Sequence, residues 1–141
     1  MDQDRGRIYF SSPYQDLDNP QTPNVHALDI NTGEIIWQRD LPLGSFAPTS
    51  AIPGVVFTGS VLAKIYAFDA DNGEQLYASP NIGNTSVASG VVVNDGILIV
   101  GGGIGARSPV TGEFPSTSTQ NSWIPNNVTA LCVPGTTNCP L

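Results

Sequence analysis

The sequence predicts an all-β fold made of repeated, four-stranded antiparallel units. A phrase at residues 27–37 returns in altered form at residues 67–77, forty positions later. Asn-Gly and Asp-Gly pairs separate short apolar runs, and such pairs are strong hairpin signals because glycine accepts the positive φ of a tight turn. No window keeps the periodicity of an amphipathic helix. These three observations favour sheets whose strands are joined by tight turns.

The repeat also predicts the architecture. The two copies read Ala27-Leu-Asp-Ile-Asn-Thr-Gly-Glu-Ile-Ile-Trp37 and Ala67-Phe-Asp-Ala-Asp-Asn-Gly-Glu-Gln-Leu-Tyr77, and Val128-Thr-Ala-Leu-Cys132 is a weaker third echo. A period near forty residues in a glycine-rich, β-prone chain is typical of β-propeller blades. A ring of four to eight blades needs roughly 160 to 320 residues, whereas the chain has 141. We therefore predict a partial β-propeller of about two and a half to three blades, a single domain over residues 1–141. It is expected to be a piece of a larger ring, and an assembly of copies that completes a ring is the alternative.

Each blade can be divided into strands A to D in chain order. The first blade, residues 5–40, starts at strand B and has strands at 7–11, 25–30 and 34–39. The second blade, residues 44–79, is complete, with strands at 47–51, 55–60, 64–69 and 74–78. The third blade, residues 84–134, has strands at 87–93, 97–101 and 127–133, with an insertion at 103–126 and a tail at 135–141.

Four repeated residues belong to the turn between strands C and D. Asp29 and Asp69 end strand C, where a carboxylate can accept the backbone N–H groups of the turn. Gly33 and Gly73 supply the conformation that the turn needs. The acidic run at residues 69–74 also has features of a calcium loop, but it lacks the later bidentate glutamate of the EF-hand spacing. A plain turn is the favoured interpretation.

Other repeated positions are expected to lie between blades. Ala27, Ala67 and Ala130 recur where a larger side chain would hold neighbouring sheets apart. Trp37 and Tyr77 occupy matching positions and offer large flat surfaces for packing between blades. These residues are therefore predicted to be structural.

The composition narrows the function classes. Twelve Asp and Glu against five Lys and Arg give a formal charge of −7, which argues against nucleic acid or an anionic membrane as partner, since both need clustered positive charge. No run of about twenty apolar residues occurs, so no membrane span is predicted. Charged residues make up only 12% of the chain, and this balance favours a periplasmic or extracellular protein. The first residues lack the apolar stretch of a signal peptide, so we expect any export signal to lie upstream.

Two cysteines, Cys132 and Cys139, flank a Pro134-Gly135 turn that could bring their sulfurs together. A disulfide between them would fit an oxidising compartment, and two free thiols in a frayed tail are the alternative. No metal site is predicted, because the chain offers one histidine, His26, and no further thiolates. The positions that match His26 in the other copies hold unrelated residues, so we expect His26 to face solvent rather than to act in catalysis.

The phrase that ends in Trp37 resembles the repeat of pyrroloquinoline-quinone (PQQ)-type β-propellers, the Ala-x-Asp-x-x-Thr-Gly-x-x-x-Trp pattern of quinoprotein alcohol dehydrogenases. The resemblance covers residues 25–101 well and the flanks loosely. It weakens in the second copy, which has Asn72 and Tyr77 in place of Thr and Trp, and in the third, which has Cys132 in place of Asp. Residues 87–103 are most similar to the closing stretch of polyvinyl-alcohol-dehydrogenase-like members, which implies a C-terminal fragment.

The resemblance implies a function as well as a fold. The complete protein is expected to oxidise a small-molecule alcohol with PQQ as hydride acceptor, with calcium as a further candidate ligand and the remaining blades as partners. In the family, Trp37 would be the docking tryptophan that packs on the adjacent blade, and the piece alone is expected to be inactive. The same repeat also builds non-catalytic scaffolds of the outer-membrane assembly lipoprotein type. A propeller that binds proteins or envelope components is therefore the alternative function.

Candidate binding residues lie in the connections between strands B and C. These connections differ most in length among the three copies, and extra length above a repeated scaffold often marks binding function. Within the insertion at 103–126, Arg107 could hold a carboxylate of the quinone and Trp123 could stack on its ring. Asn126 is a further polar candidate. A surface loop with a solvated arginine and a tryptophan that covers the blade edge is the alternative.

Overall fold

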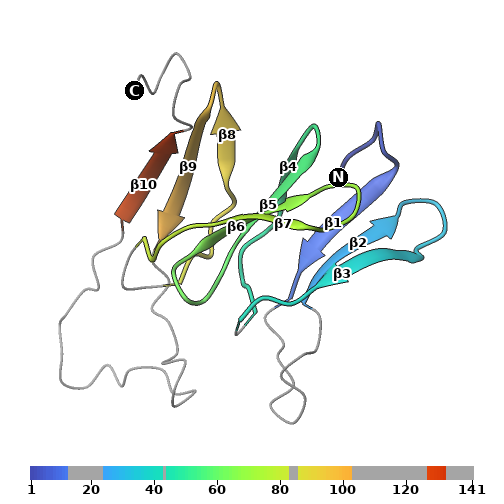
Figure 1. The fold of residues 1–141 in the computed structure, drawn as a ribbon, viewed down its shortest axis with the longest axis horizontal. Helices are drawn as coiled ribbons and strands as arrows, with labels where there is room; N and C mark the ends of the chain where they lie inside the picture. The colour runs from blue at the N-terminus through green and yellow to red at the C-terminus, as the bar shows by residue number, and fades with distance from the viewer. Residues whose placement is uncertain (13–23, 43, 83–85, 103–126, 133–141) are drawn as a thin grey trace, which may run out of the picture.

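The structure, a computed structural model, describes residues 1–12, 24–42, 44–82, 86–102 and 127–132. These residues contain ten β-strands and no helix (Figure 1), so the all-β prediction is confirmed. The strands are β1 (Arg7–Ser11), β2 (Val25–Asp29), β3 (Ile35–Arg39), β4 (Ser50–Ile52), β5 (Val55–Gly59), β6 (Ile65–Asp69), β7 (Gln75–Ala78), β8 (Val92–Asn94), β9 (Ile97–Gly102) and β10 (Asn127–Cys132). A helix capable of crossing a membrane is not found in this part of the chain.

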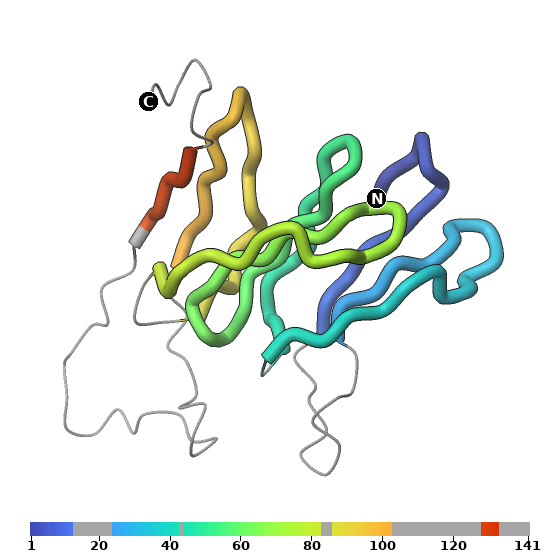
Figure 2. The backbone as a smooth tube through the Cα atoms, in the orientation of Figure 1, coloured from blue at the N-terminus to red at the C-terminus, as the bar shows by residue number. Residues whose placement is uncertain are grey.

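The strands form three antiparallel sheets, which we call blades 1, 2 and 3 in chain order. Blade 1 has the strand order β1-β2-β3, blade 2 the order β4-β5-β6-β7 and blade 3 the order β10-β9-β8. Figure 2 shows the blades following one another, blade 1 in blue and cyan, blade 2 in green and blade 3 in yellow to red. One complete blade flanked by two three-stranded blades is the partial propeller that the repeat predicts.

Strand A of blade 2 differs from its predicted bounds of 47–51, because it begins three residues later, at Ser50. The backbone of Ala47 is bonded elsewhere: its N–H donates to Ser45 Oγ (2.9 Å) and its carbonyl accepts from Ser11 Oγ of blade 1 (2.7 Å). Residues 45–47 therefore tie blade 2 to blade 1 before the strand starts.

Strand A of blade 3 is also shorter than the predicted range of 87–93. Only Val92–Asn94 pair along β9, and Val87 forms an isolated bridge with Gly102. The Val87 N–H instead donates to the Ser60 carbonyl of blade 2 (2.9 Å), and a Cβ on Gly59 would overlap the Val87 side chain. The residues that lead into blade 3 therefore contact blade 2, and fewer of them are left to pair within the sheet of blade 3.

The apolar core lies between the blades. One cluster joins blades 1 and 2 and consists of Tyr9, Val25, Ala27, Trp37, Leu41, Val56, Tyr66, Phe68 and Ala70. A second cluster joins blades 2 and 3 and consists of Ala47, Ile65, Val87, Val91 and Val100. Because each internal sheet face is covered by the next sheet, burial of these side chains holds the stack together.

The two outer faces of the stack expose apolar side chains. On blade 1 these include Ile8 (40% exposed) and Phe10 (41%), and on blade 3 they include Ile99 (44%) and Val128 (77%). These side chains lie on the two sheet faces that no other sheet of the described residues covers.

Candidate functional site

Trp37, on the last strand of blade 1, lies against the turn between β6 and β7 of blade 2. Its indole Nε1 donates a hydrogen bond of 3.1 Å to the Ala70 carbonyl, and its ring centroid lies 6.3 Å from that of Phe68. A Cβ built on Gly73 would come within 2.6 Å of the indole ring. Gly73 also has a φ of 73°, so one glycine serves both the turn and the close approach of the ring.

The Ala70 carbonyl oxygen accepts two further hydrogen bonds from blade 1. Arg7 Nη1 donates to it at 2.6 Å and Tyr9 Oη at 3.3 Å. The short contact comes from the charged donor, as expected, because charge-assisted hydrogen bonds are shorter and stronger than neutral ones. This single backbone atom is therefore the meeting point of three side chains from the neighbouring blade.

Three arginines of blade 1 reach the same turn. Arg5 Nε and Arg7 Nη1 lie 3.1 and 3.2 Å from Asp71 Oδ1, and Arg39 Nη2 donates to the Asn72 carbonyl at 2.7 Å. We call these arginines, together with Tyr9 and Trp37, the interblade clamp. The arginines of the clamp could not be predicted from the repeat, because they do not recur in it. The positions that match Arg7 hold apolar residues in the other blades.

Asp29 and Asp69 occupy equivalent turns and make the same contacts. The Oδ1 atom of each accepts the backbone N–H groups two and three residues later, at 2.8 and 2.9 Å for Asp29 and at 2.8 and 3.0 Å for Asp69. Hydrogen bonds from the backbone of Thr32 and Asn31 lower the pKa of Asp29 below its ordinary value. Both carboxylates are therefore turn caps, and the described residues contain no group of three or more side chains suited to a metal ion.

The other repeated residues differ in their solvent exposure. Ala27 and Ala67 are buried between blades, whereas Ala130 is exposed on the outer face of blade 3. Tyr77, which was expected to pack between blades as Trp37 does, is 44% exposed. The turn that would receive Tyr77 follows Cys132 in blade 3, and this stretch lies outside the described residues.

The two long connections attach at one edge of the stack. There β1 and β9 end and β2 and β10 begin, while the β4–β5 and β8–β9 turns lie at the opposite edge (Figure 1). We call this the loop edge and define it by residues 11–12, 24, 44–45, 60–64 and 102. A backbone hydrogen bond crosses between blades 1 and 2 here, from Ser45 N to the Ser12 carbonyl (3.0 Å), and a second one within blade 2 joins Val61 N to the Gly44 carbonyl (3.4 Å).

A buried hydroxyl cluster supports the loop edge. Thr58 Oγ1 donates to Ser11 Oγ at 3.2 Å and lies 3.2 Å from Ser45 Oγ, and both Thr58 and Ser45 are fully buried. A serine or threonine hydroxyl becomes a nucleophile only beside a base. These hydroxyls bond to one another and to backbone groups instead, so the cluster positions the edge rather than performing chemistry.

His26 lies on the outer face of blade 1 and is half-buried. Its ring stacks on Phe10 with centroids 4.6 Å apart, and its Nδ1 lies 2.9 Å from Gln38 Nε2. Burial lowers the pKa of His26 below its ordinary value. The expectation of a solvent-facing histidine is thus only partly met, because Phe10 covers one side of the ring.

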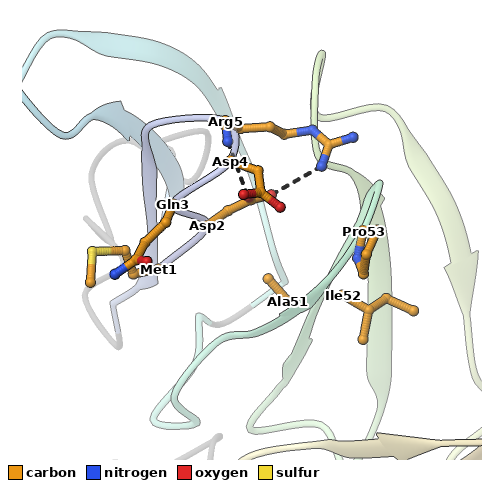
Figure 3. Close-up of a pocket in the computed structure, with 8 residues that line it drawn as sticks. All are labelled: Met1, Asp2, Gln3, Asp4, Arg5, Ala51, Ile52 and Pro53. Carbon is orange, nitrogen blue, oxygen red and sulfur yellow. Dashed lines mark hydrogen bonds and ion pairs between the residues drawn. The ribbon is translucent and has the colours of Figure 1, made fainter.

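A pocket of about 360 Å³ lies at the opposite edge, between the N-terminal turn and the β4–β5 turn. Figure 3 shows Arg5 reaching toward Asp2, and the guanidinium and carboxylate atoms are 3.1 Å apart. Desolvation acts to raise the pKa of Asp2, but hydrogen bonds from Arg5 outweigh it and the pKa is lowered. Asp2 is therefore an ionised partner of Arg5 and is unsuited to act as a general acid near neutral pH.

The residues predicted to bind the cofactor, Arg107, Trp123 and Asn126, lie outside the described residues. Cys132 ends β10, while Cys139 lies outside the described residues, so their pairing stays a prediction. The structure thus places the attachment points of the predicted site but not its side chains.

No known family model matches the chain, and no curated protein matches it significantly. Solved structures do match. The quinohemoprotein alcohol dehydrogenase from Comamonas testosteroni has a TM-score of 0.55 at 21% identity, and the quinohemoprotein alcohol dehydrogenase ADHIIG from Pseudomonas putida HK5 has 0.56 at 20%. Each match covers 70% of this chain and 16% of the other. BamB from Moraxella catarrhalis has a TM-score of 0.47 at 24% identity, over 54% of this chain and 24% of that one. The chain spans only a small part of the proteins it matches, and its fold is that of a partial β-propeller resembling the PQQ type.

Proposed function

We propose that this chain is part of a quinoprotein alcohol dehydrogenase, exported to the periplasm or beyond, which oxidises a small-molecule alcohol with PQQ as hydride acceptor. The observation that supports this most directly is the repeat phrase ending in Trp37, whose indole docks on the next blade through Ala70 and Gly73. Two solved neighbours with TM-scores above 0.5 are quinohemoprotein alcohol dehydrogenases.

The loop edge is the proposed cofactor side. PQQ carries carboxylates, which bind best to cations and hydrogen-bond donors. Arg5, Arg7 and Arg39 all bind the β6–β7 turn, which lies at the end of blade 2 opposite the loop edge. Lys64 instead lies in the β5–β6 turn, at the loop edge itself. Arg107, in the insertion that leaves the same edge, would be the second cation. One described lysine is not a complete site, so the remaining blades must supply the rest.

The proposed roles of this chain are binding and positioning. Arg107 and Lys64 would hold the acidic groups of the quinone, Trp123 would stack on its ring system, and Asn126 would donate a hydrogen bond. PQQ, when bound, supplies the electron sink for alcohol oxidation. The hydrogen-bonded hydroxyls of Ser11, Ser45 and Thr58, of which the last two are fully buried, would support this edge.

The test is a PQQ titration of the full-length protein that carries this chain, prepared without quinone and followed by absorbance and by dye-linked alcohol oxidation. We expect stoichiometric binding and alcohol-dependent dye reduction. Arg107→Ala should weaken PQQ binding at least tenfold, about 1.4 kcal/mol. Arg5→Ala is the matched control and should leave binding unchanged, because Arg5 pairs with Asp2 and Asp71 at the opposite edge.

Failure to bind PQQ would overturn the proposal and favour the non-catalytic scaffold instead. Unchanged affinity in Arg107→Ala, with binding intact, would remove Arg107 from the cofactor site while leaving the dehydrogenase assignment in place. The 141-residue chain alone is expected to show no dye-linked activity, since the site needs the other blades.

A further inference from the structure

The β6–β7 turn contains a chemically reactive pair of residues. Asn72 is followed by Gly73, and this is the only Asn-Gly pair in the sequence. The side-chain amide of an asparagine can be attacked by the backbone nitrogen of the next residue, and the attack is fastest before glycine, which has no side chain to obstruct it. Asn72 is exposed, whereas Gly73 is buried. The group that would be attacked is therefore at the surface, and the attacking nitrogen is covered.

Both reacting groups are engaged in hydrogen bonds. The Gly73 N–H donates to the Asp69 carbonyl at 2.9 Å. Asn72 Oδ1 accepts from the Glu74 N–H at 2.7 Å. The attack requires the Gly73 nitrogen to lose its proton and to approach Cγ of Asn72, so at least the first of these bonds must break. The folded turn therefore holds the pair in an unreactive arrangement.

Blade 1 keeps this turn closed. The indole of Trp37 lies so near Gly73 that a Cβ there would come within 2.6 Å of the ring. Arg39 Nη2 donates to the Asn72 carbonyl at 2.7 Å. Trp37 and Arg39 both belong to β3 of blade 1. Because rotation of the peptide between residues 72 and 73 would disturb both contacts, opening of the turn is coupled to separation of blades 1 and 2.

The equivalent turn of blade 1 lacks the reactive pair. Thr32 stands at the position of Asn72. Its Oγ1 accepts from the backbone N–H two residues later at 3.2 Å, which is the contact that Asn72 Oδ1 makes in blade 2. Nothing lies within 4 Å of a Cβ on Gly33. Of these two turns, the one with an asparagine before the glycine is the one that a tryptophan covers, and a threonine makes the same turn contact without an amide.

We propose that Asn72 and Gly73 form a self-modification site guarded by the interface between blades 1 and 2. When the blades separate, the Gly73 nitrogen bonds to Cγ of Asn72, and the side-chain nitrogen leaves as ammonia with the proton that the Gly73 nitrogen lost. Water then opens the resulting ring. Breakage of the new N–Cγ bond gives aspartate. Breakage of the original bond between this nitrogen and the main-chain carbonyl carbon gives isoaspartate, in which the chain continues through Cγ.

The isoaspartate product should prevent the blades from closing again. It adds one carbon atom to the main chain ahead of Gly73, where the indole leaves no room for a methyl group. The aspartate product keeps the main chain and retains an oxygen that can accept from the Glu74 N–H. Separation of the blades thus becomes irreversible through the isoaspartate product, as when an unfolded state is chemically modified before it refolds. This inference goes beyond the proposed function and involves neither quinone nor alcohol.

The guarding role is tested by the rate of conversion of residue 72 in the 141-residue chain, followed by mass spectrometry of its peptides at constant pH and temperature. We expect the folded chain to react at least tenfold more slowly than the chain unfolded in urea, because the reaction follows the population of the open turn. Trp37→Phe and Trp37→Ala should react progressively faster. Tyr77→Ala, which removes the exposed aromatic at the same repeat position, should react at the unmodified rate.

Amide hydrogen exchange distinguishes separation of the blades from unfolding of blade 2. The Gly73 amide reports on the turn. The Ser60 amide, which donates to the Lys64 carbonyl at 2.9 Å, reports on the other end of the same blade. The conversion rate should rise in step with exchange at Gly73 while Ser60 stays protected. If Trp37→Ala does not fold, Trp37→Phe decides, because it retains an aromatic ring.

The effect of the product is measured on separated forms of the chain. The isoaspartate form, isolated by chromatography, should have a folding equilibrium constant at least tenfold lower than that of the unmodified chain. Asn72→Asp should remain close to the unmodified chain, since its main chain is intact. Asn72→Thr is the matched control and should neither convert nor lose stability, because blade 1 has a threonine at this position.

Three results would overturn the proposal. Equal conversion rates in the folded and urea-unfolded chains would mean that the interface gives no protection. A rate that follows exchange at Ser60 rather than at Gly73 would assign the protection to blade 2 as a whole. An isoaspartate form as stable as the unmodified chain would mean that the modification does not keep the blades apart.

Discussion

Gly73 of blade 2 lies directly against the indole of Trp37 in blade 1, so closely that a Cβ on the glycine would come within 2.6 Å of the ring. The two residues belong to successive copies of the repeat, in which Gly73 is a turn residue and Trp37 an end-of-phrase aromatic. The contact therefore forms between successive copies of the repeat rather than within one.

Gly73→Ala should destabilise the chain by about 2 kcal/mol or more, because it adds overpacking against Trp37 to the strain of a positive φ. Gly54→Ala should cost only about 1 kcal/mol, because Gly54 has a similar φ of 84° but open space around it. Urea unfolding of both variants measures the difference. Equal losses would show that the turn conformation alone, and not the docking of Trp37, requires glycine at residue 73.

Removal of the indole should separate its two contributions. Trp37→Phe loses the hydrogen bond to Ala70 and should cost about 1–2 kcal/mol, while Trp37→Ala also opens a cavity and should cost about 3–5 kcal/mol. Tyr77→Ala is the matched control, since Tyr77 occupies the same repeat position but is 44% exposed, and it should stay within about 1 kcal/mol of the unmodified chain. A comparable loss in Tyr77→Ala would mean that blade 3 also receives an aromatic.

Arg7 should matter more than Arg5, although both pair with Asp71. Arg7→Met keeps the aliphatic stem but loses the 2.6 Å hydrogen bond to the partly buried Ala70 carbonyl, and it should cost about 1–2 kcal/mol. Arg5→Met should cost less, because its pair with Asp71 is exposed and its pair with Asp2 joins neighbouring residues at the surface, and such pairs contribute little and are screened by salt. Thermal unfolding at low and high salt checks this. A loss in Arg7→Met that disappears in salt would assign the effect to Asp71 rather than to the carbonyl.

His26 should make stability depend on pH. Burial lowers the pKa of His26 in the folded state, so the folded chain binds a proton less readily than the unfolded chain. Its contribution to stability is therefore complete above the unfolded-state pKa of about 6.5 and is lost as the pH falls through the folded-state value. The unfolding midpoint should drop between pH 7.5 and pH 5 by more in the unmodified chain than in His26→Gln, and identical profiles would contradict the assignment.

The predicted Cys132–Cys139 bridge can be tested on the denatured chain. Without reductant we expect no reactive thiols, and two after reduction. Closing so short a loop should contribute about 2.5 kcal/mol in the chain-entropy model, so reduction should lower the unfolding midpoint by the same amount as the Cys132→Ser, Cys139→Ser double variant. Two reactive thiols before reduction would support free cysteines instead.

The turns and strands that repeat were predictable because their signals are local. Asp29 and Asp69 cap turns through contacts two and three residues away, and the register places Trp37 on the side that faces the next blade. The bounds of β4 and β8 could not be predicted in the same way. Side-chain and backbone groups of a neighbouring blade form hydrogen bonds with the residues just before each of these strands. The sequence pattern of a single copy does not show which residues bond to the neighbouring blade.

The charged part of the clamp escaped prediction for a different reason. Arg7 and Arg39 bind the interface between blades 1 and 2, and the described residues of blades 2 and 3 contain no arginine. The candidate site was predictable only as far as its scaffold. Loop length marked the edge from which it leaves, but the contacts of Arg107, Trp123 and Asn126 depend on residues that no repeat specifies.

The anchor point for Trp37 belongs to the main chain, and this affects how the repeats can diverge. A carbonyl oxygen is present whichever amino acid occupies residue 70, so mutation there cannot delete the acceptor. The change from alanine at residue 70 to isoleucine at residue 30 alters the neighbouring surface but retains the group that an aromatic N–H would find. Successive copies can therefore drift apart in side chains while each keeps a receptor for its neighbour, and only the glycine three positions later has to stay as it is.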